Sequence, residues 1–162
     1  MWEDGRDALA DLELSSRERV LDVGCGTGEL TRVLAAETDA DVLGVDADRE
    51  LLSVAREESD GRTGYLAGDA TRLPVGDDAV DLAACQALLI NLPDPTAAVR
   101  ELARVSGDLV AAVEPDNADV RVASTVDAEE RLEREAREAY VDGVDTDVAL
   151  GDRVREAFDA AG

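Results

Sequence analysis

The 162-residue chain contains no histidine and no lysine, and its aromatic residues are one Trp, two Tyr and one Phe. The absence of histidine excludes imidazole catalysis, including a Ser-His-Asp triad, and removes the commonest metal ligand. The two cysteines, Cys25 and Cys85, lie far apart in unlike contexts. This spacing indicates neither a disulfide framework nor a zinc site, so we expect no metal centre.

Positive charge is scarce as well. The 16 basic residues, all arginine, stand against 39 acidic residues, which gives a net charge of −23. No basic stripe is available to meet phosphates, and this argues against a nucleic-acid partner. The acidity suits either a cationic partner or a salt-rich cytoplasm in which surface charges are screened. The composition resembles that of proteins from extreme halophiles, and we favour this second explanation.

Long apolar runs are absent too. No stretch approaches the length of a membrane span, and no signal-peptide pattern opens the chain, so we expect a cytoplasmic protein without a membrane partner. The length predicts a single domain over residues 1–162, with a core over 17–115 and a helical cap or C-terminal part over 116–162. Nothing in the sequence indicates an oligomeric state.

Short apolar runs alternate with helical patterns along the chain. Strands are predicted over residues 19–23, 41–46, 64–68, 80–85 and 108–113. Helices are predicted around 30–34 and 51–55, and over 94–105, 129–140 and 152–161, the third with Asp94 as N-cap and Pro95 at its first position. This alternation predicts a Rossmann-like, doubly wound, mostly parallel sheet with helices on both faces.

The segment "VLDVGCGTGEL", residues 20–30, places three glycines on alternate positions between a predicted strand and a predicted helix. A glycine-rich turn at the carboxyl end of a strand lets a ligand approach the backbone, although a tight turn without a ligand has the same pattern. A dinucleotide fingerprint would need Gly or Ala where this chain has Glu29. A nicotinamide-dependent dehydrogenase is therefore a weaker hypothesis here.

Acidic residues follow three successive predicted strands. Asp22 lies at the end of the first, and Asp46 ends the second, 20 residues after Gly26. An acid in that second position is well placed to accept hydrogen bonds from both ribose hydroxyls. Asp69 follows the third strand, where a carboxylate can accept from an exocyclic amine such as that of adenine. The three acids together indicate a nucleoside-containing ligand.

The segments "VLDVGCGTG", "VLGVD", "GDATRLP" and "DDAVDLAACQALLINLPDPTAAVRELARV" resemble the class I S-adenosylmethionine-dependent methyltransferases, most closely the small-molecule group called type 11, over about residues 1–115. The resemblance implies S-adenosylmethionine as cofactor and a small-molecule methyl acceptor. It also implies the cofactor contacts: Gly24, Cys25 and Gly26 along the methionine part, Asp22 orienting its amino group, Asp46 at the ribose, Ala47 beside the adenine, Asp69 and the Ala70 amide at the adenine edge, and Cys85 and Gln86 near the transferred methyl group.

The chain departs from this family in two respects. Many relatives carry a histidine after the fourth strand, where this chain has Ile90 and Asn91, so no histidine base can be assigned. The catalytic residue stays unknown, with Glu114 at the end of the fifth strand and Asn91 as candidates. The family's last two strands have no counterpart before residue 162, which suits a five-stranded version of the domain or the absence of a C-terminal piece. A non-catalytic cofactor-binding module or remnant methyltransferase is therefore the alternative to an enzyme.

Overall fold

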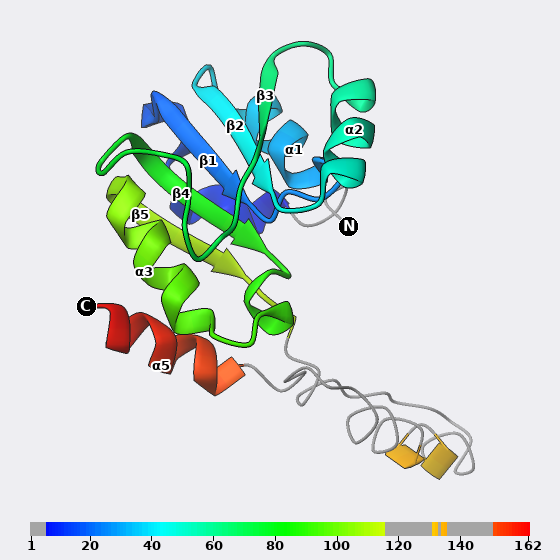
Figure 1. Ribbon diagram of the computed structural model, residues 1–162, viewed down its shortest axis with the longest axis vertical. Helices are drawn as coiled ribbons and strands as arrows, with labels where there is room; N and C mark the ends of the chain where they lie inside the picture. Colours follow the sequence, from blue (N-terminus) through cyan, green and yellow to red (C-terminus); the bar gives the residue numbers. More distant parts are fainter. Residues whose placement is uncertain (1–5, 116–130, 133, 136–150) are drawn as a thin grey trace.

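The computed structural model describes residues 6–115, 131–132, 134–135 and 151–162 (Figure 1). Five strands form one parallel sheet in the order β3-β2-β1-β4-β5. Their bounds are Arg19–Val23 for β1, Asp41–Asp46 for β2, Thr63–Ala67 for β3, Val80–Gln86 for β4 and Ser106–Val113 for β5. The predicted doubly wound parallel sheet is thereby confirmed.

The helices are close to those predicted. They are α1 (Glu29–Glu37), α2 (Arg49–Glu58), α3 (Pro95–Val105) and α5 (Gly151–Ala161), with 3₁₀ helices η1 (Arg6–Leu12), η2 (Leu14–Ser16) and η3 (Leu89–Asn91). The predicted N-cap of α3 is confirmed, since the Asp94 side chain accepts a hydrogen bond from the Ala97 amide at 3.1 Å. The predicted strand at 64–68 begins and ends one residue earlier as β3, and the predicted helix at 129–140 lies mostly outside the described residues.

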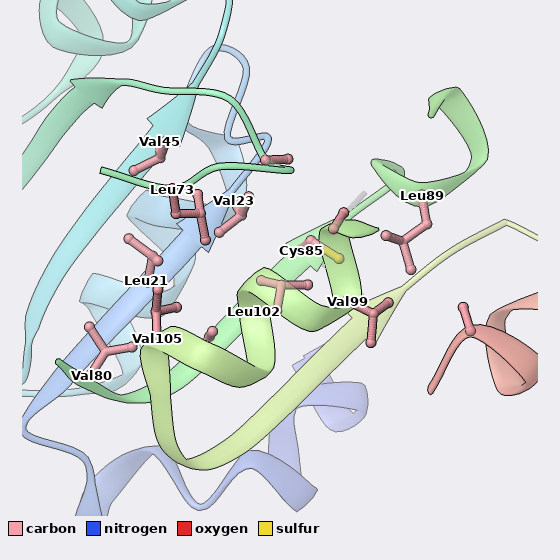
Figure 2. Packing of buried hydrophobic residues seen from close by; sticks show 14 of the residues in the cluster. Leu21, Val23, Val45, Leu73, Val80, Cys85, Leu89, Val99, Leu102 and Val105 are labelled. Carbon is pink, nitrogen blue, oxygen red and sulfur yellow. The ribbon is translucent and has the colours of Figure 1, made fainter. Parts of the chain in front are cut away.

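Alternate residues of β1, β2, β4 and β5 enter two apolar layers, because successive side chains of a strand point to opposite faces. Val20 and Leu82 pack with Leu34 of α1 on one face, whereas Leu21 packs with Leu102 of α3 on the other (Figure 2). Helix α5 lies alongside α3 and adds to this second layer (Figure 1). Among the helices that the structure describes, none is both long enough and apolar enough to cross a membrane.

The strand order reverses between β1 and β4. The chain runs outward from β1 through β2 to β3 and then returns to place β4 on the other side of β1. Ligands of such sheets bind beyond the carboxyl ends of the strands at this reversal. The segments that meet there are the glycine loop after β1 and the residues that follow β4.

Candidate functional site

The glycine loop between β1 and α1 has a left-handed backbone at each glycine. The φ angles are +72° at Gly24, +54° at Gly26 and +78° at Gly28. The loop is fixed to the end of β2, because the amides of Gly24 and Cys25 donate to the Val45 carbonyl at 2.8 and 3.1 Å. The glycine residues are thus required by the path of the backbone.

The three glycines of the loop differ in how much room a side chain would have at each position. A Cβ at Gly24 would lie 2.7 Å from Leu88 Cδ1, and one at Gly28 would lie 2.5 Å from the Tyr65 hydroxyl oxygen. A Cβ at Gly26 would meet no atom of the described residues within 4 Å. The protein's own side chains therefore fill the space beside two of the glycines, and Gly26 is the one beside which a ligand could lie.

Asp22 is buried beneath this loop, with 1% of its surface exposed. Its Oδ2 accepts a hydrogen bond from the Thr31 hydroxyl at 2.6 Å, whereas its Oδ1 has no partner among the described residues. Burial raises the pKa of this carboxyl from 3.8 to about 7, because the charged form is poorly solvated there. Thr31 was missed in the sequence analysis, and its signal was a polar residue at an apolar position of the predicted helix.

The acids after β2 and β3 are more accessible. The Asp46 carboxylate accepts from the Gly26 amide and from the Asp48 amide, both at 2.8 Å. It therefore also fixes Gly26, the glycine of this loop that has open space beside it. Asp69 is exposed, and its Oδ1 accepts from the amide and the hydroxyl of Thr71 at 2.8 and 2.7 Å. These hydrogen bonds hold the pKa of Asp69 below its usual value. The three predicted acids thus lie at the carboxyl ends of three adjacent strands: Asp22 and Asp46 within the last two residues of β1 and β2, and Asp69 just after β3.

A cavity of about 190 Å³ opens at the reversal of strand order. It is lined by Asp22, Gly24, Cys25, Gly26, Thr27, Glu29, Leu30, Gln86 and Ala87. Five of the predicted cofactor-binding residues are therefore brought together here. Ala47 is exposed after β2 and Ala70 is buried after β3, so both lie at the same edge of the sheet but outside this cavity.

Cys85, by contrast, is not brought to the cavity. Its side chain is fully buried in the apolar layer under α3, and its Sγ lies 4.0 Å from Glu114 Oε1. Burial raises the pKa of both thiols, to about 12 for Cys25. Both cysteines are therefore protonated and unreactive at neutral pH.

The two candidate catalytic residues have structural partners instead. The Glu114 carboxylate accepts from the amides of Leu88, Leu89 and Ile90 at 2.9, 2.9 and 3.2 Å. It therefore fixes the segment that follows β4. The Asn91 side chain donates to the Ala87 carbonyl at 2.8 Å and closes the same turn. Neither residue lines the cavity, so a catalytic role for Glu114 or Asn91 stays a prediction.

The cavity and its surroundings fit one end of S-adenosylmethionine. A buried carboxylate oxygen without a partner suits the amino group of a methionine moiety, and Gly26 leaves room beside the backbone. The volume lies below the roughly 300–1,000 Å³ of enclosed ligand pockets, so the nucleoside would lie along the open edge near Asp46 and Asp69. No group of three or more metal-ligating side chains occurs among the described residues.

A larger cavity of about 400 Å³ lies at the opposite ends of the strands. Its lining includes Arg19 and Asp41, the first residues of β1 and β2, with Val42, Leu43 and Val80. The amino ends of parallel strands are not where ligands of such sheets bind. We therefore assign the candidate site to the smaller cavity, because it combines the reversal of strand order with the buried acid.

The sequence pattern that defines the methyltransferase domain family matches residues 21–110, more than half of the chain. The chain belongs to this family. The methyltransferase GfsG of Streptomyces halstedii is 39% identical over 99 residues, which make up 58% of this chain and 36% of that protein. The chain spans less than half the length of this and other curated relatives.

Solved structures support the fold. A chain of the Haloferax volcanii complex that contains the Trm112 methyltransferase activator is 26% identical, with a TM-score of 0.71 over 97% of this chain and 65% of that one. A SAM-dependent methyltransferase from Aquifex aeolicus is 22% identical, with a TM-score of 0.66 over 83% of this chain and 76% of that one. The family and the fold are thus those expected for a class I methyltransferase.

Proposed function

We propose that this domain binds S-adenosylmethionine at the carboxyl ends of β1, β2 and β3 and directs its methyl group to a small-molecule acceptor. The observation that carries the proposal is the open space beside Gly26, which borders a cavity lined by buried Asp22, whose Oδ1 has no hydrogen-bond partner in the part of the chain that the structure describes. The family match supports the same conclusion. The 1–162 chain would act as one cofactor-binding domain, with substrate selection in its C-terminal part.

Each predicted contact has a chemical reason in this proposal. Asp22 would accept a hydrogen bond from the amino group of the methionine moiety, and the Gly24–Gly26 backbone would lie along it. The Asp46 carboxylate would accept from the ribose hydroxyls, since each of its oxygens has only one backbone donor. Asp69 and the Ala70 amide would meet the adenine edge, with Ala47 beside the ring. Gln86 would lie near the methyl group.

The cofactor would supply a methyl group activated by a sulfonium. The contribution of the chain is to hold an acceptor in line with that group and to exclude water, and orientation of this kind supplies several kcal/mol. Neither Glu114 nor Asn91 lines the cavity, and the sequence contains no histidine. An acceptor that reacts through an existing lone pair would need no base, and one that must lose a proton could pass it to solvent.

Calorimetric titration in molar potassium chloride tests the proposal, with S-adenosylmethionine, S-adenosylhomocysteine and NADH as ligands. We expect binding of the first two only, whereas tight binding of NADH alone would favour a dehydrogenase. Binding without methyl transfer to any acceptor in cell extracts would favour the non-catalytic module. The activator in the Haloferax volcanii neighbour makes a protein partner a further variable, so the titration is repeated with an activator of that type.

Asp46→Ala is the sharpest variant for this test. We expect it to weaken binding of S-adenosylhomocysteine about tenfold or more, because hydrogen bonds to a charged group contribute about 1.5–3 kcal/mol each. Asp46→Asn keeps an oxygen for the Gly26 amide and separates loss of the ribose contact from collapse of the loop. Asp41→Ala, at the other end of β2, removes the same charge and serves as control. Wild-type affinity in folded Asp46 variants would contradict the ribose assignment.

The acidic composition leads to a second proposal, that the protein is adapted to high salt. A net charge of −23 repels itself strongly at low ionic strength, and the Debye length falls from about 10 Å at 0.1 M salt to about 3 Å at 1 M. We expect the free energy of unfolding to rise with potassium chloride concentration up to molar levels. Equal stability at 0.1 M and 2 M salt would exclude this adaptation.

A further inference from the structure

The crossover from β3 to β4, residues 68–79, consists of turns and coil without a helix. Parallel strands are usually joined through a helix that packs on the sheet. Here Ala70 and Leu73 of the crossover enter the core and Val75 packs against it, and Figure 2 shows Leu73 among Val45 and Val23. The same crossover carries Asp69, so its position decides where that carboxylate lies.

One side chain of α3 holds most of this crossover. The Arg104 guanidinium donates to the carbonyls of Leu73 and Val75 at 3.2 and 2.9 Å, and to Asp77 Oδ1 at 2.7 Å. It also forms a two-bond pair with Glu101, at 2.8 and 2.7 Å. A planar guanidinium can make all these bonds at once, whereas an ammonium cannot reproduce their directions.

Glu101 completes the anchor. Its Oε2 accepts from the Leu73 amide at 2.8 Å, so both backbone polar groups of Leu73 are bound to α3 through the Arg104–Glu101 pair. The Asp78 amide also donates to the Arg104 carbonyl at 3.0 Å. These contacts keep the pKa of Glu101 below its usual value, and hence the pair stays charged.

The turn that carries Asp69 is closed on itself between two attachments. The Arg72 amide donates to the Asp69 carbonyl at 3.0 Å, and Thr71 binds the Asp69 carboxylate. On one side the Gly68 amide donates to the Asp46 carbonyl at 2.9 Å, which joins the turn to β2. On the other side the turn leads to Leu73 and its anchor. Loss of the anchor would leave the turn attached only through β2 and through the buried Ala70.

We propose that Arg104, acting with Glu101, is a positioning residue that fixes the Asp69 carboxylate and thereby the selectivity of the site for adenine. The inference rests on the proposed function, since Asp69 meets the adenine amine only if the nucleoside lies along this edge. Arg104 itself touches no ligand. Its effect is specific to the base, because the glycine loop and Asp46 are held by other contacts.

The test compares S-adenosylhomocysteine with S-inosylhomocysteine, in which an oxygen replaces the adenine amine. Calorimetry in molar potassium chloride gives the ratio of the two dissociation constants for each variant. We expect the wild type to prefer the adenosyl ligand by about tenfold or more, from the hydrogen bond to a charged acceptor. We expect Arg104→Lys to remove most of this preference, so that the two dissociation constants differ by no more than about twofold. The affinity for the inosyl ligand should stay nearly constant.

Matched variants separate positioning from general loss of structure. Arg100→Lys, one turn earlier on α3, should keep the wild-type ratio, because among the described residues Arg100 donates only to the Ala160 carbonyl. Glu101→Gln retains an acceptor for the Leu73 amide and should lower the ratio in part, which keeps the test valid if Arg104→Lys fails to fold. In an Asp69→Asn background, Arg104→Lys should change the ratio no further.

The outcomes are distinct. If folded Arg104→Lys binds both ligands more weakly by the same factor, its role is structural and the inference is overturned. If the ratio is unchanged in both Arg104→Lys and Glu101→Gln, the inference is overturned as well. If the wild type binds neither ligand, the proposed function itself fails, and the inference fails with it. A wild type that binds both ligands equally supports the cofactor site but refutes the role of Asp69 and Arg104.

Discussion

The buried carboxyl of Asp22 should make the stability of the protein fall as pH rises through the neutral range. Its pKa is about 7 in the folded chain and 3.8 in the reference state, so the folded protein holds a proton that the unfolded chain releases. Stability therefore declines by about 1.4 kcal/mol per pH unit between about pH 4 and 7, and no further above that range. The full loss over these roughly 3 units is about 4 kcal/mol.

Asp22→Asn removes this titration while its amide oxygen can still accept from the Thr31 hydroxyl. The new amide nitrogen would lack an acceptor, but that cost does not depend on pH. We therefore expect the difference in unfolding free energy, variant minus wild type, to rise by about 3 kcal/mol from pH 5 to pH 7 and then to level off. Denaturant unfolding in molar potassium chloride, followed by circular dichroism, measures it.

Asp81→Asn provides the control of opposite sign. The amides of Glu18 and Arg19 donate to Asp81 and hold its pKa below 3.8, so its contribution is constant above about pH 5 and is lost only in acid. The free energy of unfolding of the Asp81 variant should therefore change with pH in the same way as that of the wild type from pH 5 to 8. If the unfolding free energy of the Asp22 variant also follows that of the wild type over this range, the Asp22 carboxyl is not protonated in the folded protein. The reasoning from its burial is then refuted.

Two further variants test the packing around the site by unfolding and turnover. A Cβ in Gly44→Ala would lie 2.8 Å from Tyr65 Cδ1 and 2.9 Å from Cys25 Sγ. We therefore expect the free energy of unfolding to fall by about 1–3 kcal/mol. An unchanged denaturation midpoint would show that the two side chains move aside without cost. Glu114→Gln keeps one acceptor for three amides, and we expect a loss of about 1–3 kcal/mol in stability. Loss of turnover at unchanged stability would instead support the predicted catalytic role of Glu114.

The strands and the positions of the acids could be predicted from local pattern. Central parallel strands are covered on both faces and therefore appear as continuous apolar runs, as in 80–85. The positions of Asp46 and Asp69 at strand ends could be predicted as well, because the distance in sequence between each acid and its strand is short. The boundaries of α3 followed from the cap at Asp94 and from Pro95, two residues whose preferences act within one turn.

The contacts that give the site its shape could not be predicted, because they join segments far apart in the chain. Leu88 fills the space beside Gly24, which the sequence analysis assigned to the cofactor, and Tyr65 fills the space beside Gly28. Glu114 was named as a candidate catalytic residue, but the sequence did not indicate that it binds amides about 25 residues earlier in the chain. An acid at a strand end looks the same in the sequence whether it binds a ligand or a neighbouring backbone.

A chain with 39 acidic residues offers many such acids. The structure distinguishes them by the groups that donate hydrogen bonds to each carboxylate. Asp46, Asp81, Glu101 and Glu114 each accept from backbone amides of another segment and so fix loops that a sheet alone would leave free. An acid such as Asp39 or Glu57 has no such bond among the described residues, and its replacement should change only the response to salt. The acids that fix loops should instead affect ligand binding at every salt concentration, because their partners are backbone groups and not screened surface charges.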